Sequence, residues 1–209
     1  MKVAILQCDN VLEKFQSRFG DYPDMVARMF VGRKPPFSFH TYDCRRDNFP
    51  EDIDAFDFYI TTGSKATVYD NDEWIQKTIR FIQKLDSNQK KCIGICFGHQ
   101  LMAMACGGKV EKSEKGWGVG VAENPVMFQP VWMREAVSQI NILASHQDQI
   151  ITLPANTEVI AGNDFCPFFV VQWGRHFLSI QGHPEWNTEY SRTLINDRRA
   201  IIDKATSLL

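Results

Sequence analysis

The stretch that decides the fold is residues 90–100, which read KKCIGICFGHQ. A short apolar run ends at Ile95, and a helix is expected to begin after Cys96, which stands between Gly94 and Gly98. This order of strand, glycine-flanked cysteine and helix is typical of a nucleophile elbow, in which the nucleophile lies on a sharp turn. Glycines suit these positions because they lack a Cβ and let the strand and the helix approach closely.

Short apolar runs alternate with amphipathic stretches on either side of this segment. Strands are expected at 3–7, 56–62, 91–95, 119–122, 140–145, 158–161, 168–173 and 177–181. Helices are expected at 22–30, 72–85, 98–106 and 188–209. This alternation predicts a three-layer α/β fold, with a mostly parallel central sheet and helices on both faces.

The second half of the chain is rich in strands. The run FFVVQWGRHFLSI (168–180) resembles a hairpin that turns at Gly174. We therefore expect an antiparallel extension on the same sheet. No linker, low-complexity stretch or internal repeat interrupts the chain, so one domain over residues 1–209 is expected.

Composition excludes several classes of protein. The chain has 209 residues, of which 44% are hydrophobic and 23% charged, which argues against disorder. A formal net charge of −2 gives no reason to expect a nucleic-acid or membrane partner. The N-terminal apolar run is too short for a secretory signal, because Asp9 and Asn10 end it. A cytoplasmic location is expected.

Six cysteines are present: Cys8, Cys44, Cys92, Cys96, Cys106 and Cys166. Without a secretory signal, their thiols should be reduced. No CxxC pair occurs, so neither a metal site nor a thioredoxin-like site is expected, and no cofactor is predicted. Five of these residues are expected to be small buried apolar side chains.

Cys96 differs from the other cysteines in its position. It is expected at a helix N-terminus, where the helix dipole favours a thiolate. The N–H of Phe97 would be available to bind an oxyanion. A buried structural cysteine in a strand–helix turn explains this segment equally well until partner residues are found.

A thiolate that transfers acyl groups needs a general base and a group that orients it. Of five histidines, His183 follows a strand directly in SIQGHPEW. Residues i and i+2 of an extended stretch project on the same side, so Glu185 is placed to hold the His183 ring. His99 follows Cys96 too closely, and His40 and His176 have no carboxylate nearby in the sequence. The alternative is a loop histidine beside a helix-capping glutamate.

Together these segments resemble the class I glutamine amidotransferase domain over nearly the whole chain. The segments are TTGS (61–64), GICFGHQ (94–100), GWG (116–118), SHQDQ (145–149) and QGHPE (181–185). The resemblance implies a flavodoxin-like class I amidotransferase fold. It also implies a triad in which Cys96 is the nucleophile, His183 the general base and acid, and Glu185 its orienting partner. Such a thiolate attacks a γ-glutamyl carbonyl, and water then hydrolyses the glutamyl thioester.

The same resemblance assigns further residues. It implies an oxyanion hole made by the backbone N–H groups of Gly63 and Phe97. The substrate-binding positions that it implies are Gln100, Ser145, His146 and Gln147. The segments TGSKATVYD (62–70) and ASHQDQ (144–149) are most similar to stand-alone relatives of the GMP synthase glutaminase domain, a group that includes γ-glutamyl peptidases. Lys65 and Thr67 depart from the usual residues of that loop, which predicts an altered substrate choice.

Several functions remain open at this point. The first is a γ-glutamyl hydrolase or peptidase that acts alone on a small-molecule substrate. The second is a glutaminase subunit that delivers ammonia to a synthetase partner in trans. The amidotransferase domain is expected to fill nearly all 209 residues and no phosphate-binding loop motif is present, so no ammonia acceptor is expected in the same chain. A non-enzymatic relative that binds a metabolite or protein, and a cysteine protease or redox chaperone with a similar elbow, are weaker alternatives.

Overall fold

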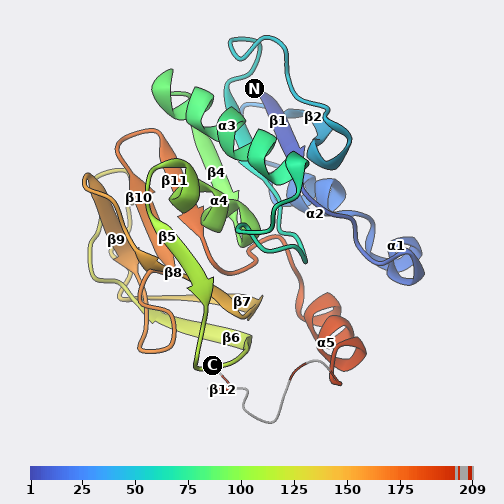
Figure 1. Ribbon diagram of the computed structural model, residues 1–209, viewed down its shortest axis with the longest axis vertical. Helices are drawn as coiled ribbons and strands as arrows, with labels where there is room; N and C mark the ends of the chain where they lie inside the picture. The colour runs from blue at the N-terminus through green and yellow to red at the C-terminus, as the bar shows by residue number, and fades with distance from the viewer. Residues whose placement is uncertain (201, 203–206, 209) are drawn as a thin grey trace.

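The computed structural model describes residues 1–200, 202 and 207–208, and its elements are labelled in Figure 1. The strands are β1 (Lys2–Gln7), β2 (Ser38–Asp43), β3 (Phe58–Thr61), β4 (Cys92–Ile95), β5 (Lys109–Lys112), β6 (Gly118–Pro125), β7 (Gln139–His146), β8 (Asp148–Thr152), β9 (Thr157–Ala161), β10 (Val170–Trp173), β11 (Phe177–Ile180) and β12 (Ser207–Leu208). The helices are α1 (Glu13–Phe19), α2 (Tyr22–Arg28), α3 (Glu73–Ser87), α4 (Phe97–Ala105) and α5 (Thr188–Asp197), with a short 3-10 helix at Cys44–Arg46.

A seven-stranded sheet forms the centre of the molecule, in the order β2-β1-β3-β4-β11-β10-β9. The first five of these strands are parallel to one another, whereas β10 runs antiparallel to both β11 and β9. The hairpin between β10 and β11 turns at Gly174, whose φ of 55° lies in the left-handed region that favours glycine. The predicted mostly parallel sheet with an antiparallel extension is confirmed.

Alternating side chains of the central strands are buried on the two faces of this sheet. Ala4 and Leu6 belong to a core cluster shared with α3 and α4, whereas Val3 and Ile5 belong to a second cluster shared with Val26 of α2. Successive residues of a strand point to opposite faces, so one strand contributes to both clusters. The sheet therefore lies between two layers of helices, as predicted, and α3 and α4 cover the face seen in Figure 1.

The sequence pattern left open which sheet two further strands of the second half join. The strands expected at 119–122 and 140–145 do not join the central sheet. Instead, β6 and β7 pair with each other over eight residues, and with β12 they form a separate three-stranded sheet. β5 and β8, which the sequence analysis did not predict, form a third sheet of two strands. The long β6–β7 ladder satisfies the backbone groups of both strands, and Ala122 and Ala144 pack against Phe169.

The terminal helix is shorter than predicted. A helix was expected over 188–209, but α5 ends at Asp197 and Arg198 is its C-cap. The Arg198 amide donates to the carbonyl groups of both Leu194 and Asn196, so the regular helical pattern tightens into a turn there. Asn and Asp are weak helix formers, which explains an end at this point. The predicted helix also included residues 201, 203–206 and 209, which lie outside the described residues.

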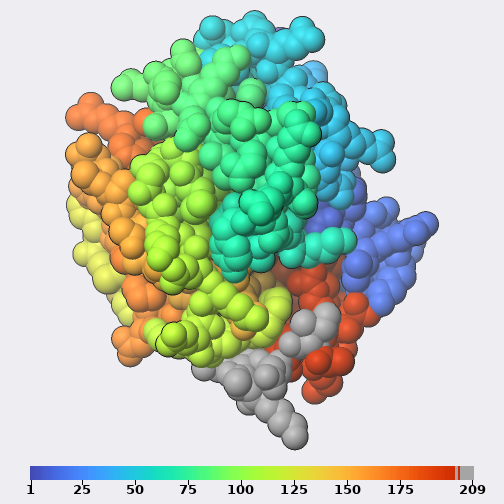
Figure 2. All heavy atoms as spheres, in the orientation of Figure 1, coloured from blue at the N-terminus to red at the C-terminus, as the bar shows by residue number. Residues whose placement is uncertain are grey.

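Helices α1 and α5 lie side by side on one side of the molecule. Ion pairs join Lys14 to Asp197 and Arg18 to Glu189, and so link α1 with α5. Figure 2 shows the red atoms of the α5 region beside the blue atoms of the N-terminal region.

All six cysteines are free, and all except the half-buried Cys106 are buried. No helix in the described part of the chain has the length and apolar character needed to cross a membrane.

Candidate active site

Cys96 occupies a strained turn between β4 and α4. Its backbone has φ 49° and ψ −99°, a conformation that a non-glycine residue rarely adopts. A Cβ on Gly94 would lie 2.7 Å from the carbonyl oxygen of Gly98, and a Cβ on Gly98 would overlap Thr61 Oγ1. The Cys96 amide donates to the carbonyl of Ile180 at 2.8 Å, which fixes the turn to β11. The elbow geometry expected from GICFG is therefore present.

Three neighbouring parallel strands bring the predicted catalytic residues together. Gly63 follows β3, Cys96 follows β4 and His183 follows β11, and these strands lie side by side in the order β3-β4-β11. The carboxyl ends of parallel strands meet at one edge of a sheet, where ligands of α/β proteins bind. A Cβ on Gly63 would lie 2.9 Å from His183 Cε1 and 3.7 Å from Cys96 Cβ. Gly63 thus lies in contact with both residues.

His183 is fixed on several sides. Its Nδ1–H donates to Glu185 Oε1 at 2.7 Å, and both residues are buried. The Trp186 ring stacks on the imidazole, with centroids 3.6 Å apart and planes 8° from parallel. The His183 backbone amide donates to the carbonyl of Leu143 at 2.7 Å. The ring is therefore held in one orientation beside Cys96.

The charge of His183 follows from its neighbours. Burial alone lowers the pKa of His183, but the interactions with Glu185 and with the Cys96 side chain outweigh burial and raise this pKa to about 10. The imidazolium form is thus favoured at neutral pH. An imidazolium next to Cys96 stabilises a thiolate, as a cysteine nucleophile requires.

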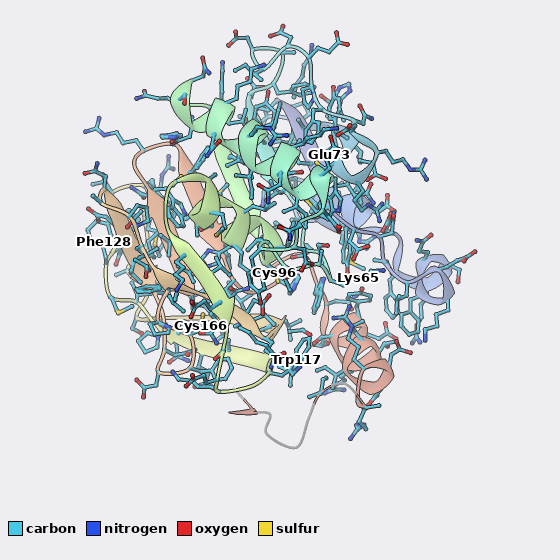
Figure 3. All side chains as sticks on the ribbon, viewed as in Figure 1. Lys65, Glu73, Cys96, Trp117, Phe128 and Cys166 are labelled. Carbon is cyan, nitrogen blue, oxygen red and sulfur yellow. The ribbon has the colours of Figure 1, made fainter. Side chains whose placement is uncertain are left out.

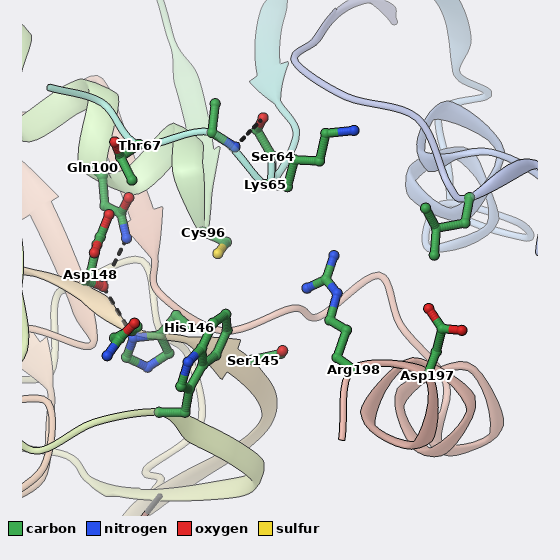
Figure 4. A pocket seen from close by; sticks show the side chains of 14 residues that line it. Ser64, Lys65, Thr67, Cys96, Gln100, Ser145, His146, Asp148, Asp197 and Arg198 are labelled. Carbon is green, nitrogen blue, oxygen red and sulfur yellow. Dashed lines mark hydrogen bonds between the residues drawn. The ribbon is translucent and has the colours of Figure 1, made fainter. Parts of the chain in front are cut away.

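A cavity of about 430 Å³ opens in front of Cys96. Figure 4 shows the Cys96 sulfur directed into it. In Figure 3, Cys96, Lys65 and Trp117 lie around the same region between the central sheet and α5. All four positions that the resemblance assigned to substrate binding line the cavity, namely Gln100, Ser145, His146 and Gln147. The other lining residues are Leu12, Ser64, Lys65, Ala66, Thr67, Trp117, Asp148, Asp197 and Arg198.

Gln100 is held by a chain of hydrogen bonds that ends at Cys96. Its Nε2 donates to the Asp148 carbonyl at 2.9 Å and to Gln181 Oε1 at 3.2 Å. Gln181 Nε2 in turn donates to Cys96 Sγ at 3.6 Å. Gln181 is fully buried, and the sequence analysis gave it no role although it stands in the QGHPE segment.

Polar atoms without partners face this region from its wall. Burial lowers the pKa of His146 to about 4, so this ring is neutral. His146 Nδ1–H donates to the Asp148 carbonyl at 3.2 Å, whereas its Nε2 has no partner among the described residues. Within the same part of the chain, the hydroxyl groups of Ser145 and Thr67 are also buried without a partner. Buried polar groups are normally paired, so these atoms are suited to binding a polar ligand.

The family can be assigned at this point. The sequence profile of the family described as glutamine amidotransferase class-I matches residues 36–200, a stretch that contains Cys96, His183 and Glu185. This chain belongs to the class I glutamine amidotransferase family. The resemblance that the sequence motifs indicated is thereby confirmed.

Relatives of this chain carry several names. Gamma-glutamyl peptidase 5 of Arabidopsis thaliana is 34% identical over 148 residues, which are 68% of this chain and 59% of that protein, less than two thirds of its length. A glutamine amidotransferase-like protein of Schizosaccharomyces pombe is 31% identical over 210 residues, 92% of this chain and 82% of that one. A crystal structure of a glutamine amidotransferase from Thermotoga maritima has a TM-score of 0.78 at 18% identity, covering 97% of this chain and 84% of the other, and shows the same fold.

The remaining histidines of this amidotransferase lie elsewhere. His99 Nδ1 bonds to the buried Ser179 hydroxyl at 2.7 Å, and His40 packs against Phe56. His176 has no carboxylate nearby in the sequence, but the fold brings its Nε2 to 2.8 Å from Asp86 Oδ1 of α3, ninety residues away. Among the residues that the structure describes, no group of three or more His, Cys, Asp or Glu side chains is placed to hold a metal ion.

Proposed function

We propose that this protein hydrolyses a γ-glutamyl amide bond of a small molecule through a glutamyl thioester on Cys96. The observation that carries the proposal is the position of the Cys96 sulfur, which points into the cavity while a hydrogen-bonded His183–Glu185 pair lies next to it. This is the nucleophile, base and orienting group that acyl transfer requires.

In the first half of the proposed reaction, the Cys96 thiolate attacks the γ-carbonyl carbon of the substrate. The carbonyl oxygen becomes an oxyanion, which the backbone N–H groups of Gly63 and Phe97 would stabilise. The His183 imidazolium then gives its proton to the leaving nitrogen, and the C–N bond breaks. Ammonia or an amine departs, and a glutamyl thioester remains on Cys96.

In the second half, water attacks the thioester and gives its proton to the neutral His183 ring. The C–S bond breaks, the thiolate forms again and glutamate leaves. Glu185 accepts a hydrogen bond from His183 throughout and stabilises the imidazolium each time that it forms. Gln100, Ser145, His146 and Gln147 are assigned to the α-amino-acid end of the substrate, because all four line the cavity. The unpaired polar atoms of Ser145 and His146 support this assignment.

A second candidate is a glutaminase that passes ammonia to a synthetase in trans. It is favoured by the similarity to the GMP synthase (glutamine-hydrolyzing) of Azoarcus sp., which is 32% identical over 174 residues, 77% of this chain but only 31% of that protein. The chemistry on Cys96 is the same in both candidates. They differ in the leaving group and in the need for a partner.

The purified protein distinguishes these candidates. We expect steady release of amine from γ-glutamyl peptides, complete loss of this activity in Cys96→Ala, and inactivation by iodoacetamide. Turnover restricted to glutamine, and absent until a partner is added, would favour the ammonia-supplying subunit. Turnover that survives Cys96→Ala would exclude both candidates.

A further inference from the structure

Two cationic side chains line the cavity in front of Cys96. Lys65 comes from the loop after β3, and Arg198 is the C-cap of α5. Figure 4 shows the Arg198 guanidinium extending from the end of α5 toward the loop that carries Lys65. Within residues 1–200, 202 and 207–208, neither side chain donates a hydrogen bond or forms an ion pair. Two unpaired cations in one cavity mark a binding region for an anion.

The carboxylates of the same cavity do not neutralise these cations. Asp197 is paired with Lys14 of α1. Asp148 lies on the opposite side of Cys96 in Figure 4, where its backbone carbonyl accepts hydrogen bonds from Gln100 and His146. Amide and imidazole groups and Asp148 thus lie on one side of Cys96, and the two cations lie on the other side together with Asp197, which is paired with Lys14.

Both cationic residues start from a fixed backbone. The Lys65 amide donates to Asp9 Oδ2 at 3.0 Å, and the other oxygen of this buried carboxylate lies 3.3 Å from an Arg45 nitrogen. The Arg198 amide is fixed by the last turn of α5. Both side chains thus start from fixed backbone positions at the rim of the cavity.

We propose that Lys65 and Arg198 bind a carboxylate carried by the leaving group of the substrate. The inference rests on the proposed function and deepens it. With the glutamyl group on the side of Gln100 and His146 and the scissile carbonyl at Cys96, the leaving amine extends toward Arg198. The preferred substrates are then γ-glutamyl amino acids or peptides, because a guanidinium pairs with a carboxylate through two parallel hydrogen bonds. Ammonia released from glutamine carries no such group.

The test compares two substrates that differ in one charge, γ-glutamylglycine and γ-glutamylglycinamide. We expect wild-type kcat/KM to be about tenfold higher for the carboxylate, the size of one charged hydrogen bond. Lys65→Gln and Arg198→Gln should each reduce this preference, and the double variant should abolish it. The quantity compared between variants is the ratio of kcat/KM for the two substrates, so that an effect common to both substrates cancels. Arg198→Lys should keep part of the preference because it retains the charge.

Arg199→Gln provides a matched control. Arg199 is the neighbouring residue, its side chain is exposed and bonds to Asn196 Oδ1, and it does not line the cavity. This variant changes the net charge by the same amount and should retain the full preference. A preference lost equally in Arg199→Gln would show a general charge effect and would overturn the inference.

Two other results would also overturn the inference. A wild-type enzyme that cleaves both substrates equally well has no anion site for the leaving group. An equal fall on both substrates in Arg198→Gln would mean that the cations bind the carboxylate of the glutamyl group instead. Failure of the proposed function is distinguishable from these results, because no γ-glutamyl compound, glutamine included, would then be cleaved at all.

Discussion

His183 lies between two groups that stabilise its protonated form, Glu185 and the Cys96 side chain, and this pair of contacts raises its pKa to about 10. Glu185→Gln keeps the size of the side chain but removes the charge. We expect the pKa of His183 to fall and the ion pair with Cys96 to weaken. Alkylation of Cys96 by iodoacetamide near pH 7 should be slower in the variant, and kcat should fall by about 100-fold or more, as for other orienting carboxylates.

The raised pKa of His183 also predicts how stability depends on pH. The unfolded histidine has a pKa near 6.5, below the folded value, so the folded state binds the proton more tightly. This stabilisation is fully present below about pH 6.5 and is lost as the pH rises through about 10. Urea unfolding at pH 6, 8 and 10 should show that the free energy of unfolding falls more steeply with pH for the wild type than for Glu185→Gln. Parallel curves for the two proteins would contradict the assigned cause.

Gly63 gives a second prediction for a single residue. In Gly63→Ala, the new Cβ would lie 2.9 Å from His183 Cε1, and the ring cannot easily yield because Glu185 and Trp186 hold it. If His183 is the proposed general base, moving its ring by about 1 Å costs about 100-fold in rate. We expect kcat to fall by about that factor while the protein remains folded, as measured by steady-state kinetics and circular dichroism. A Gly63→Ala variant with the kcat of the wild type would contradict the close contact between residue 63 and the His183 ring.

The elements meet at the elbow, where α4 lies against the ends of β3 and β4. Gly98→Ala would overlap Thr61 Oγ1 and push α4 away from the sheet. Overpacking of this kind costs about 1–3 kcal/mol of unfolding free energy or more. Thr61→Ala removes a hydroxyl that has no partner among the described residues, so the double variant should recover part of the loss. If the changes in unfolding free energy of the two single variants simply added in the double variant, the predicted overlap between residue 98 and Thr61 would be contradicted.

At the scale of the whole molecule, the features that could be predicted from the sequence are those that depend on the local pattern of residues. The alternation of strands and helices predicted the parallel sheet, and the order of strand, Cys96 and helix predicted the elbow. The HPE segment predicted that His183 and Glu185 would meet. These features follow from period and spacing alone. The edge strand β2 was missed because its residues are mostly polar and half-exposed or exposed.

Features that depend on distant contacts were not predictable from local pattern. The contribution of Arg198 to the cavity depends on where α5 ends and on how α5 packs against α1 through Lys14 and Asp197. The stacking of Trp186 on His183 also appears only in three dimensions. The pairing of β6 with β7 in a separate sheet was not predictable, because alternation along a strand does not identify its partner strand.

The central claim is that Cys96 carries the glutamyl group, and the mass of the acid-quenched protein tests this claim most directly. Wild-type protein mixed with a γ-glutamyl peptide should gain the mass of one glutamyl group, located on the peptide that contains Cys96. Cys96→Ala should gain nothing under the same conditions. A glutamyl group on another residue, or γ-glutamyl turnover that persists in Cys96→Ala, would contradict the account.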